Sequence, residues 1–278
     1  MIQAETFAPS PPLADFVRAY VSLCGSPPDG RYVRPIIARP DVVIAFNLAR
    51  RHQAFEYRTG APRLLPSALI VGPQTSRRAD LWFDTPWASF TISLQPAAFQ
   101  RLFHLPIQPF LDRALDAYDV LGHELAVLHD RLREAPDAAA RVRLVEAFLL
   151  QRIPAAGPSH PATAAASALL TSAGRLSVRG AAQVAGLSER HLERAFGEWM
   201  GVPPKLYARI VRLNYVLRLK AQRPELTWAA ISHDAGYFDQ THLVKDFKAM
   251  VGEAPGTYMR RSAPADGGFL LSSTPAHP

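Results

Sequence analysis

Two short segments near the C-terminus place polar side chains at helical spacing. One runs from Ser188 to Met200 and the other from Asp239 to Met250. Arginine can bond guanine bidentately, glutamine can bond adenine, and glutamate can accept from cytosine N4, while a DNA major groove admits one α-helix. The polar faces hold Arg190, Glu193 and Arg194 in the first segment, and Gln240, Thr241, Lys245 and Lys248 in the second. These types and spacings predict two recognition helices; an ordinary solvated face is the alternative.

The two segments are copies of one pattern. Residue pairs at an offset of 51 keep their chemistry, and Arg194 corresponds to Lys245. The pairs are Leu192/Leu243, Phe196/Phe247, Gly201/Gly252, Pro204/Pro255 and Tyr207/Tyr258. Chance is a poor explanation for so many matches, so the C-terminal region contains an internal repeat.

Each copy predicts a helix-turn-helix. A short helix comes first, over 178–185 and 228–235, and Gly186 or Gly236 then turns the chain because glycine tolerates a left-handed conformation. The expected N-caps are Ser177 and Ser188 in the first copy and Thr227 and Asp239 in the second. The expected buried stripes are Leu192, Phe196 and Trp199, then Leu243, Phe247 and Met250.

A longer helix is expected between the copies, over Lys205 to Gln222. Its apolar stripe consists of Ile210, Leu213, Leu217 and Ala221. At 1.5 Å per residue it is about 25 Å long. It could therefore hold two recognition helices roughly one DNA turn, about 34 Å, apart on one face of the duplex.

Residues from about 161 to 261 resemble the DNA-binding domain of AraC/XylS-type bacterial transcription regulators. The matching segments are "VAGLSERHLERAFGEWMGVPPKLY", "RIVRLNYVL" and "DAGYFDQTHLVKDFKAMVGEAPGTYMRR". The resemblance implies seven helices, with the first recognition helix dominating base contact. The DNA-binding candidates are Ser188, Arg190, His191, Glu193, Arg194, Gln240, Thr241, Lys245 and Lys248. Glu189 and Glu193 make the first helix more acidic than in many relatives. Glu193 either binds cytosine or weakens phosphate binding.

The charge distribution agrees with a polyanionic partner. The net charge is +7, but residues 1–169 carry 17 basic and 15 acidic side chains, whereas residues 175–261 carry 14 basic and 8 acidic ones. The excess therefore lies in the C-terminal third. Cys24 is the only cysteine. This excludes an internal disulfide and a multi-cysteine metal site, and fits a reducing cytoplasm. No apolar run has membrane-spanning length and no signal pattern begins the chain, so we expect a cytoplasmic protein.

The N-terminal half predicts antiparallel β-structure. Short runs rich in β-branched and aromatic residues follow one another from Val42 to Gln95, separated by turns. We expect a small sandwich or barrel, then helices, and hence an α+β chain overall. The segments "PSPPLADFVRAYVSL" and "LLPSALIVGPQTS" resemble an N-terminal domain found on some AraC-type regulators. In that family a cupin-like barrel at this position often binds a small effector. We therefore expect a sensing and dimerisation domain at 1–155, a linker around 154–162, a DNA-binding domain at 161–261 and a mobile tail at 262–278.

The effector-site candidates include aromatic side chains that alternate along the predicted strands, Phe46, Tyr57, Trp82 and Trp87, with core packing as their alternative use. Arg39 and Asn47 are the candidates for polar contacts. His52, His104, His123 and His129 are scattered and lack the clustered spacing of a cupin metal site. We expect no metal and no cofactor.

Three helices are expected between the strands and the linker. "PAAFQRLF" is short, and Leu121, Leu125, Leu128 and Leu132 recur at helical spacing, which predicts a helix from Val120 to Arg133. Asp137 can cap the next helix, which is expected to run to about Ile153. The leucine stripe packs on its own barrel or pairs with a second subunit. The breadth of apolar surface on the following helix favours a homodimer.

The leading hypothesis is a sequence-specific transcription regulator controlled by a small effector. Its expected partners are double-stranded DNA, the effector, a second copy of the chain and RNA polymerase. A DNA-linked enzyme is the alternative from another class, but one cysteine cannot form a zinc-thiolate methyl-acceptor site, and no nucleophile elbow, phosphate loop or paired-carboxylate pattern is present. A ligand-independent regulator, or a degenerate paralogue that acts only through protein contacts, is the third possibility.

Overall fold

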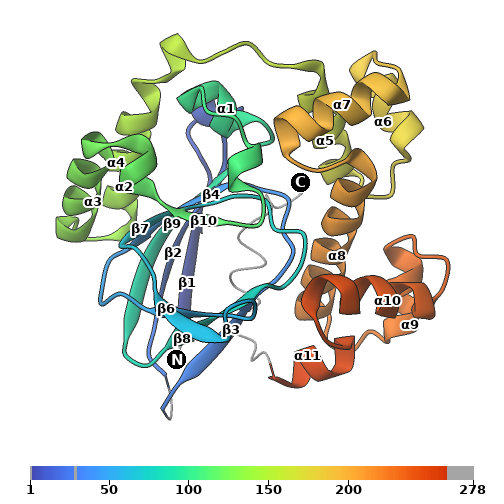
Figure 1. Ribbon diagram of the computed structural model, residues 1–278, viewed down its shortest axis with the longest axis horizontal. Helices are drawn as coiled ribbons and strands as arrows, with labels where there is room; N and C mark the ends of the chain where they lie inside the picture. Colours follow the sequence, from blue (N-terminus) through green and yellow to red (C-terminus); the bar gives the residue numbers. More distant parts are fainter. Residues whose placement is uncertain (1, 28–29, 262–278) are drawn as a thin grey trace.

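The computed structural model describes residues 2–27 and 30–261. A β-rich N-terminal part with helices on one side lies next to a column of helices built from the C-terminal part (Figure 1). The predicted tail at 262–278 lies outside the described residues. None of the described helices is long and apolar enough to span a membrane.

The N-terminal part contains two antiparallel sheets. The six-stranded sheet has the order β1 (Ile2–Phe7), β2 (Val17–Gly25), β9 (Trp87–Leu94), β4 (Val43–Asn47), β7 (Ala68–Val71) and β10 (Ala114–Asp116). The four-stranded sheet has the order β3 (Tyr32–Ile36), β8 (Ala79–Phe83), β5 (Gln53–Glu56) and β6 (Ala61–Leu64). The predicted antiparallel architecture is confirmed, but β1, β2 and β3 precede Val42, where the sequence analysis placed the first strand.

Helices cover one face of the six-stranded sheet. They are α1 (Ala98–Phe103), α2 (Ala117–Leu121), α3 (His123–Glu134) and α4 (Ala138–Leu150), with short 3-10 turns at Pro11–Leu13, Gln108–Phe110 and Ile153–Ala155. Alternate residues of β4 and β9, such as Phe46 and Ile92, join them in one core. Asp137 caps α4 as predicted, since its carboxylate accepts from the Ala140 amide at 2.7 Å.

The single helix predicted over Val120 to Arg133 is wrong. Gly122 has φ +77°, a left-handed conformation that ends α2 at Leu121 and lets α3 start in a new direction. Leu125, Leu128 and Leu132 of α3 are at most 3% exposed and pack into the core of their own sheet. The leucine stripe is therefore used within the chain. The stripe is therefore not available for pairing with a second subunit, while the expected homodimer, which rested on the apolar breadth of α4, stays a prediction.

Seven described helices form the C-terminal part, as the resemblance implied. They are α5 (Pro161–Thr171), α6 (Val178–Ala185), α7 (Glu189–Met200), α8 (Pro204–Gln222), α9 (Trp228–Asp234), α10 (Gln240–Val251) and α11 (Pro255–Arg261). The four predicted N-caps are confirmed. Ser177, Ser188, Thr227 and Asp239 each accept a hydrogen bond from the amide three residues ahead.

The long helix α8 separates two small cores. One contains α5, α6 and α7, and the other contains α9, α10 and α11 (Figure 1). Leu243, Phe247 and Met250 are buried as predicted. In α7, Leu192 and Phe196 are buried as predicted, whereas Trp199 is only half-buried against the same core and stacks on His160 at 4.9 Å; Ala195 and Met200 are buried as well. On α8, Ile210, Leu213 and Leu217 are buried, but Ala221 is only half-buried.

Candidate functional site

The first candidate site is the outer face of α7. Ser188, Arg190, His191, Glu193 and Arg194 are all exposed and lie away from the buried stripe. Among residues 2–27 and 30–261, no ion pair or hydrogen bond involves the guanidinium of Arg190 or Arg194. These cations are therefore available to an anionic partner, one helical turn apart on the same face.

The outer face of α10 repeats this arrangement. Gln240, Thr241, Lys245 and Lys248 are exposed, and within the described part of the chain neither lysine takes part in an ion pair. The inner face contains a buried charge, because Asp246 is 3% exposed and accepts hydrogen bonds from Nη2 and Nε of Arg209 on α8, at 2.8 and 3.3 Å. This bidentate pair fixes how α10 is rotated about its axis, and so which side chains face outward.

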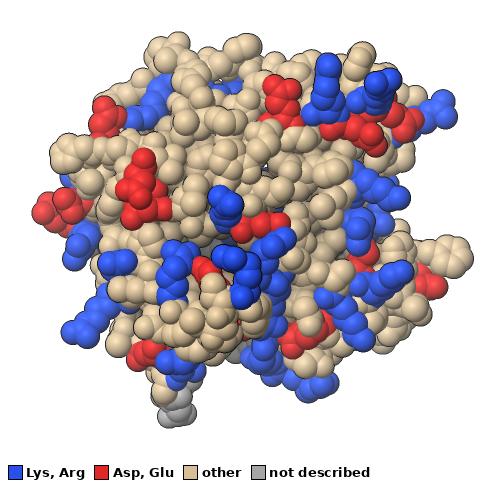
Figure 2. Space-filling view, in the orientation of Figure 1, with Lys and Arg blue, Asp and Glu red and all other residues tan. Residues whose placement is uncertain are grey.

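Basic side chains are spread along the edge where α6 to α10 lie. Figure 2 shows Lys and Arg on this side of the molecule, with fewer acidic residues between them. The face is continuous from one repeat to the other because α8 joins them. A positive face of this kind suits a polyanion that is longer than either repeat.

The N-terminal domain holds the C-terminal end of both outer helices. Gln108 donates from its amide nitrogen to the carbonyls of Gly197 and Glu198 in α7, at 2.9 and 2.7 Å. The Met250 carbonyl in the last turn of α10 accepts from the backbone amides of Ala38 and Arg77, at 3.4 and 3.0 Å. The last carbonyls of a helix lack partners within it. The same domain thus satisfies them at equivalent places in both repeats.

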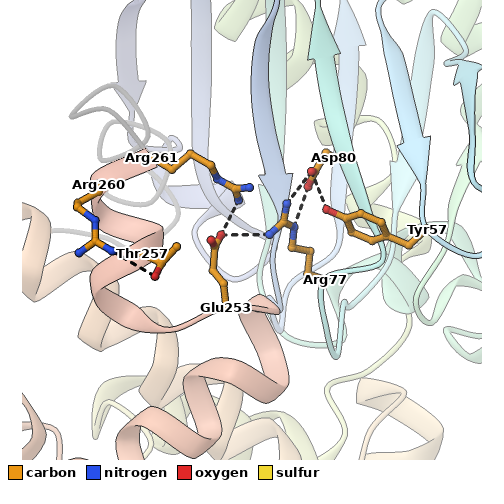
Figure 3. Close-up of polar contacts among 7 residues, drawn as sticks. All are labelled: Tyr57, Arg77, Asp80, Glu253, Thr257, Arg260 and Arg261. Carbon is orange, nitrogen blue, oxygen red and sulfur yellow. Dashed lines mark hydrogen bonds and ion pairs between the residues drawn. The ribbon is translucent and has the colours of Figure 1, made fainter.

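A charged network reinforces the contact at α10. Arg77 makes a bidentate pair with Asp80, at 2.6 and 2.8 Å, and its third nitrogen lies 3.1 Å from Glu253, between α10 and α11 (Figure 3). Arg261 also pairs with Glu253, and the hydroxyl of Tyr57 donates to Asp80 at 2.7 Å. Burial, the hydrogen bond to Asp80 and the charge of Asp80 raise the pKa of Tyr57 to about 12.

A buried carboxylate lies under the first turn of α8. Asp41 is 5% exposed and accepts from Arg39 at 2.7 and 3.0 Å and from the Ser93 hydroxyl. Burial favours the protonated acid, but the charges of Arg39 and Arg18 and these hydrogen bonds outweigh it and lower the pKa of Asp41 to about 2. Arg18 also interacts with buried Tyr207 of α8, so the charge cluster joins the sheet to the helix column.

A cavity of about 1200 Å³ lies between the two sheets. Its walls come from alternate strand residues, such as Leu81 and Phe83 on β8 and Ser89 and Thr91 on β9. Asn214 of α8 and Tyr258 of α11 line its other end, next to the anchored end of α10. The cavity thus reaches from the interior of the N-terminal domain to the second helix-turn-helix.

The lining of the cavity is apolar with an excess of positive charge. Among the described residues, only two acidic ones line it, Glu56 and Asp112. The lining arginines are Arg34, Arg39, Arg58, Arg63, Arg77, Arg78 and Arg113. Several of these arginines form ion pairs with carboxylates, for example Arg63 with Glu56 and Arg78 with Asp112. Arg58 and Arg113 are exposed, and in the described residues their guanidinium groups form no hydrogen bond or ion pair.

The structure places the effector-site candidates in different environments. Arg39, Asn47, Tyr57 and Trp87 line the cavity, as does Phe46, although the Phe46 ring packs against His129 in the core on the helix side. Trp82 is not among the residues that line this cavity. Side chains alternate between the two faces of a strand, and Leu81 and Phe83 of β8 face the cavity. The side chain of Trp82 therefore lies on the other face of the sheet, where it stacks on Phe55 at 4.9 Å.

The side chain of Asn47 forms hydrogen bonds within the turn that follows β4. Its amide nitrogen donates to the Arg50 carbonyl at 3.0 Å, and its side-chain oxygen accepts from the Ala49 amide at 3.2 Å. The Asn47 carbonyl accepts from Nε2 of His129 at 2.9 Å, and Tyr118 contacts the other ring nitrogen. Burial lowers the pKa of His129, so the neutral ring is favoured in this structural role.

Several residues of the site escaped the sequence analysis, among them Arg77, Gln108 and Phe238. Gln108 has no motif around it, and its role depends on a contact across 89 and 90 positions of sequence. Phe238 did carry a signal, because it is an aromatic residue directly before the Asp239 cap. Within the described residues, no group of three or more His, Cys, Asp or Glu side chains could hold a metal ion.

Comparisons with known proteins support the resemblance. Residues 181–261 match the family described as "Helix-turn-helix domain", and residues 5–116 match a "Domain of unknown function (DUF6597)". The HTH-type transcriptional regulator GlxA of Rhizobium meliloti (strain 1021) is 33% identical over 108 residues. That match covers 38% of this chain and a third, 33%, of GlxA.

Solved structures of ToxT from Vibrio cholerae are also similar. One from strain O395 has a TM-score of 0.47 and 13% identity, over 98% of this chain and 99% of ToxT. Another, at 1.65 Å resolution, has a TM-score of 0.49 and 12% identity, over 94% and 98%. Taken with the repeat and its capped helices, the family match confirms the resemblance. This chain joins an AraC-type helix-turn-helix domain to an N-terminal domain of the family that matches residues 5–116.

Proposed function

We propose that the chain is a sequence-specific, DNA-binding transcription regulator. The observation that supports this best is the duplication of one polar face. Arg190 and Arg194 on α7, and Lys245 and Lys248 on α10, are exposed and have no protein partner among the described residues. In a helix-turn-helix, the N-terminal residues of the second helix contact base edges in the major groove. Here a single chain presents two such helices.

The frame around the helices suits successive grooves of one duplex. With 19 residues, α8 is about 28 Å long at 1.5 Å per residue. The outer helices lie at its two ends, which approaches the roughly 34 Å between equivalent positions one DNA turn apart. In this arrangement Arg190, Arg194, Gln240 and Thr241 contact bases, while Lys248 lies nearer phosphate. Glu193 accepts from cytosine N4 or reduces phosphate affinity, and the base preference next to Arg194 separates these roles.

The proposal is tested by DNA binding of the full chain. Operator candidates come from DNA upstream of its own gene and from selection in a randomised duplex library. Fluorescence anisotropy across a salt series measures affinity and the number of phosphate contacts. We expect at least a thousandfold preference for the selected site over random DNA, with a steep salt slope. Equal, weak binding to both would overturn the proposal.

We further propose that the cavity binds a small effector with an apolar body and an anionic group. The apolar strand faces suit the body, and the surplus of arginine over carboxylate in the lining suits the anion. Tyr57, Arg77, Asn214 and Tyr258 all border the cavity near the anchored end of α10. A ligand there contacts the groups that hold the second recognition helix, which gives it a route to change DNA affinity.

The effector proposal is tested by thermal-shift screening of organic acids against their neutral amides. We expect acids to raise the melting temperature of the full chain and their amides to do so much less. Ala45→Phe, in the cavity wall, is the matched variant because its ring takes up cavity volume. It is expected to bind operator DNA and to lose the response to acids. An unchanged response in Ala45→Phe places the effector elsewhere.

A further inference from the structure

One aromatic side chain on the second helix-turn-helix is almost fully exposed. Phe238 is 94% exposed, whereas the next most exposed large hydrophobic side chain among the described residues, Val184, is 54% exposed. Phe238 lies in the turn between α9 and α10, directly before the N-cap Asp239. Burying a phenylalanine side chain normally stabilises a fold, and the fold does not use that stabilisation here.

The equivalent residue of the first repeat does have a folding role. Leu187 aligns with Phe238 at the offset of 51 and also precedes an N-cap. It is half-buried and packs against the first core, to which Leu192 also belongs. Leu187 and Leu192 stand at the two positions of a hydrophobic staple, the residue before the N-cap and the fourth residue of the helix.

In the second repeat the residue before the N-cap does not pack on the core. Leu243, the fourth residue of α10, is 1% exposed without help from Phe238. Tyr237, the residue directly before Phe238, is 6% exposed and belongs to the same core. The fold therefore has no need of a large apolar group at 238.

The surroundings of Phe238 indicate which partner covers it. Gln240 and Thr241, in the first turn of α10, are exposed next to it in sequence, and Lys245 continues the same helix. An apolar protein surface would have to bury these polar and charged groups along with the ring. The DNA major groove instead offers acceptors and donors for Gln240, phosphates for lysine, and one apolar group, the 5-methyl of thymine, for an aromatic ring.

We propose that Phe238 is a specificity-determining residue that packs on a thymine methyl group in the half-site contacted by α10. The inference rests on the proposed DNA-binding function and adds a contact to it. It also makes the two half-sites different. The α10 half-site requires a thymine at one position, while half-buried Leu187 gives the α7 half-site no such requirement.

Thymine-to-deoxyuracil substitution tests this contact, because it removes only the methyl group. The probe is the selected operator duplex, with each thymine replaced in turn, and the full-length protein is measured by anisotropy. We expect one substitution, in the α10 half-site, to weaken wild-type binding about fourfold, the equivalent of one buried methyl group. Phe238→Ala is expected to weaken binding to the thymine operator about tenfold. At the critical position it should make thymine and deoxyuracil equivalent.

Two controls keep the result specific. Val184→Ala removes the next most exposed large hydrophobic side chain, on α6, and is expected to keep wild-type affinity. The melting temperature of Phe238→Ala should match the wild type, since the ring supports no core.

If wild-type protein shows no operator preference, the proposed function fails. If it does, and Phe238→Ala binds every duplex like wild type, this inference is overturned. Loss of transcription activation with intact DNA binding would also overturn it, in favour of a protein partner.

Discussion

Nη1 of Arg77 lies 3.1 Å from the Glu253 carboxylate, a contact between two residues 176 positions apart in sequence. It joins the N-terminal domain to the end of α10, and both side chains are at most 15% exposed. Glu253→Gln removes the charge while Arg77 keeps Asp80. We expect a loss of about 1–2 kcal/mol in local stability, because hydrogen bonds to charged groups exceed neutral ones. Hydrogen exchange should become roughly 5- to 30-fold faster in α10 and α11.

The matched change is Gln108→Ala, which removes the side chain that donates to the Gly197 and Glu198 carbonyls. Faster exchange is then expected in the last turn of α7 and not in α10. The pair of variants separates the two anchors. Uniform acceleration over both helices in either variant would show that the anchors are not independent.

Arg194 provides a direct test of base contact. We expect Arg194→Ala to reduce affinity for the selected operator by about 1–3 kcal/mol and affinity for random DNA much less. Removing a guanidinium that bonds a base edge reduces the protein's sequence discrimination. Removing one that bonds phosphate reduces its affinity for all DNA sequences. Equal losses on both duplexes would assign Arg194 to phosphate.

Two glycines that both have positive φ angles are expected to differ in how much a substitution by alanine destabilises the fold. Gly174 and Gly186 have φ values of +73° and +64°. A Cβ on Gly174 would lie 2.2 Å from the Ala208 carbonyl of α8, whereas one on Gly186 meets nothing within 4 Å. Gly186→Ala should cost about 1–2 kcal/mol for the left-handed conformation alone. Gly174→Ala adds overpacking of about 1–3 kcal/mol. Chemical denaturation measures both, and equal losses would contradict the clash.

His52 predicts a pH dependence of stability. Burial, together with the nearby charge of Arg34, lowers its pKa from 6.5 to about 4. The folded state thus favours the neutral ring, so this contribution is complete above pH 6.5 and is lost as the pH falls toward 4. We expect His52→Gln to reduce the decline in unfolding free energy over this range by about 1–3 kcal/mol. Exposed His123→Gln should keep the wild-type decline, and a wild-type decline in His52→Gln would rule out this role.

Local patterns were sufficient to predict the C-terminal fold. The caps Ser177, Ser188, Thr227 and Asp239, and the apolar spacing after them, determine each helix within a few residues of chain. Trp199 shows the limit of this reasoning. Both Trp199 and Met200 fit an apolar helical stripe, yet Met200 is buried while Trp199 is half-buried and stacks on His160, a contact that no local pattern predicts.

The N-terminal domain was less accessible from sequence because its form depends on distant pairing. Strand β2 pairs with β9 some 70 residues away, and its buried run "VRAYVSL" lacks the alternation that would reveal a strand. For the cavity, period-2 alternation did favour Tyr57 and Trp87, but the face that Trp82 occupies depends on the register of β8 with β5. The contacts of Gln108 and Arg77 with the helix column have no local signature at all.

The anchoring of α7 and α10 on one domain has a consequence for the arrangement of the binding site. Each inserted base pair rotates one half-site relative to the other by about 34–36° and moves it about 3.4 Å. A frame held at both ends, by Gln108 and by the Met250 carbonyl, cannot follow that screw motion. Five inserted base pairs turn the second half-site to the opposite side of the duplex, and ten restore its direction but leave it a full turn too far away. Under the proposed function, we therefore expect the chain to discriminate the spacing of two half-sites as strictly as their base sequences.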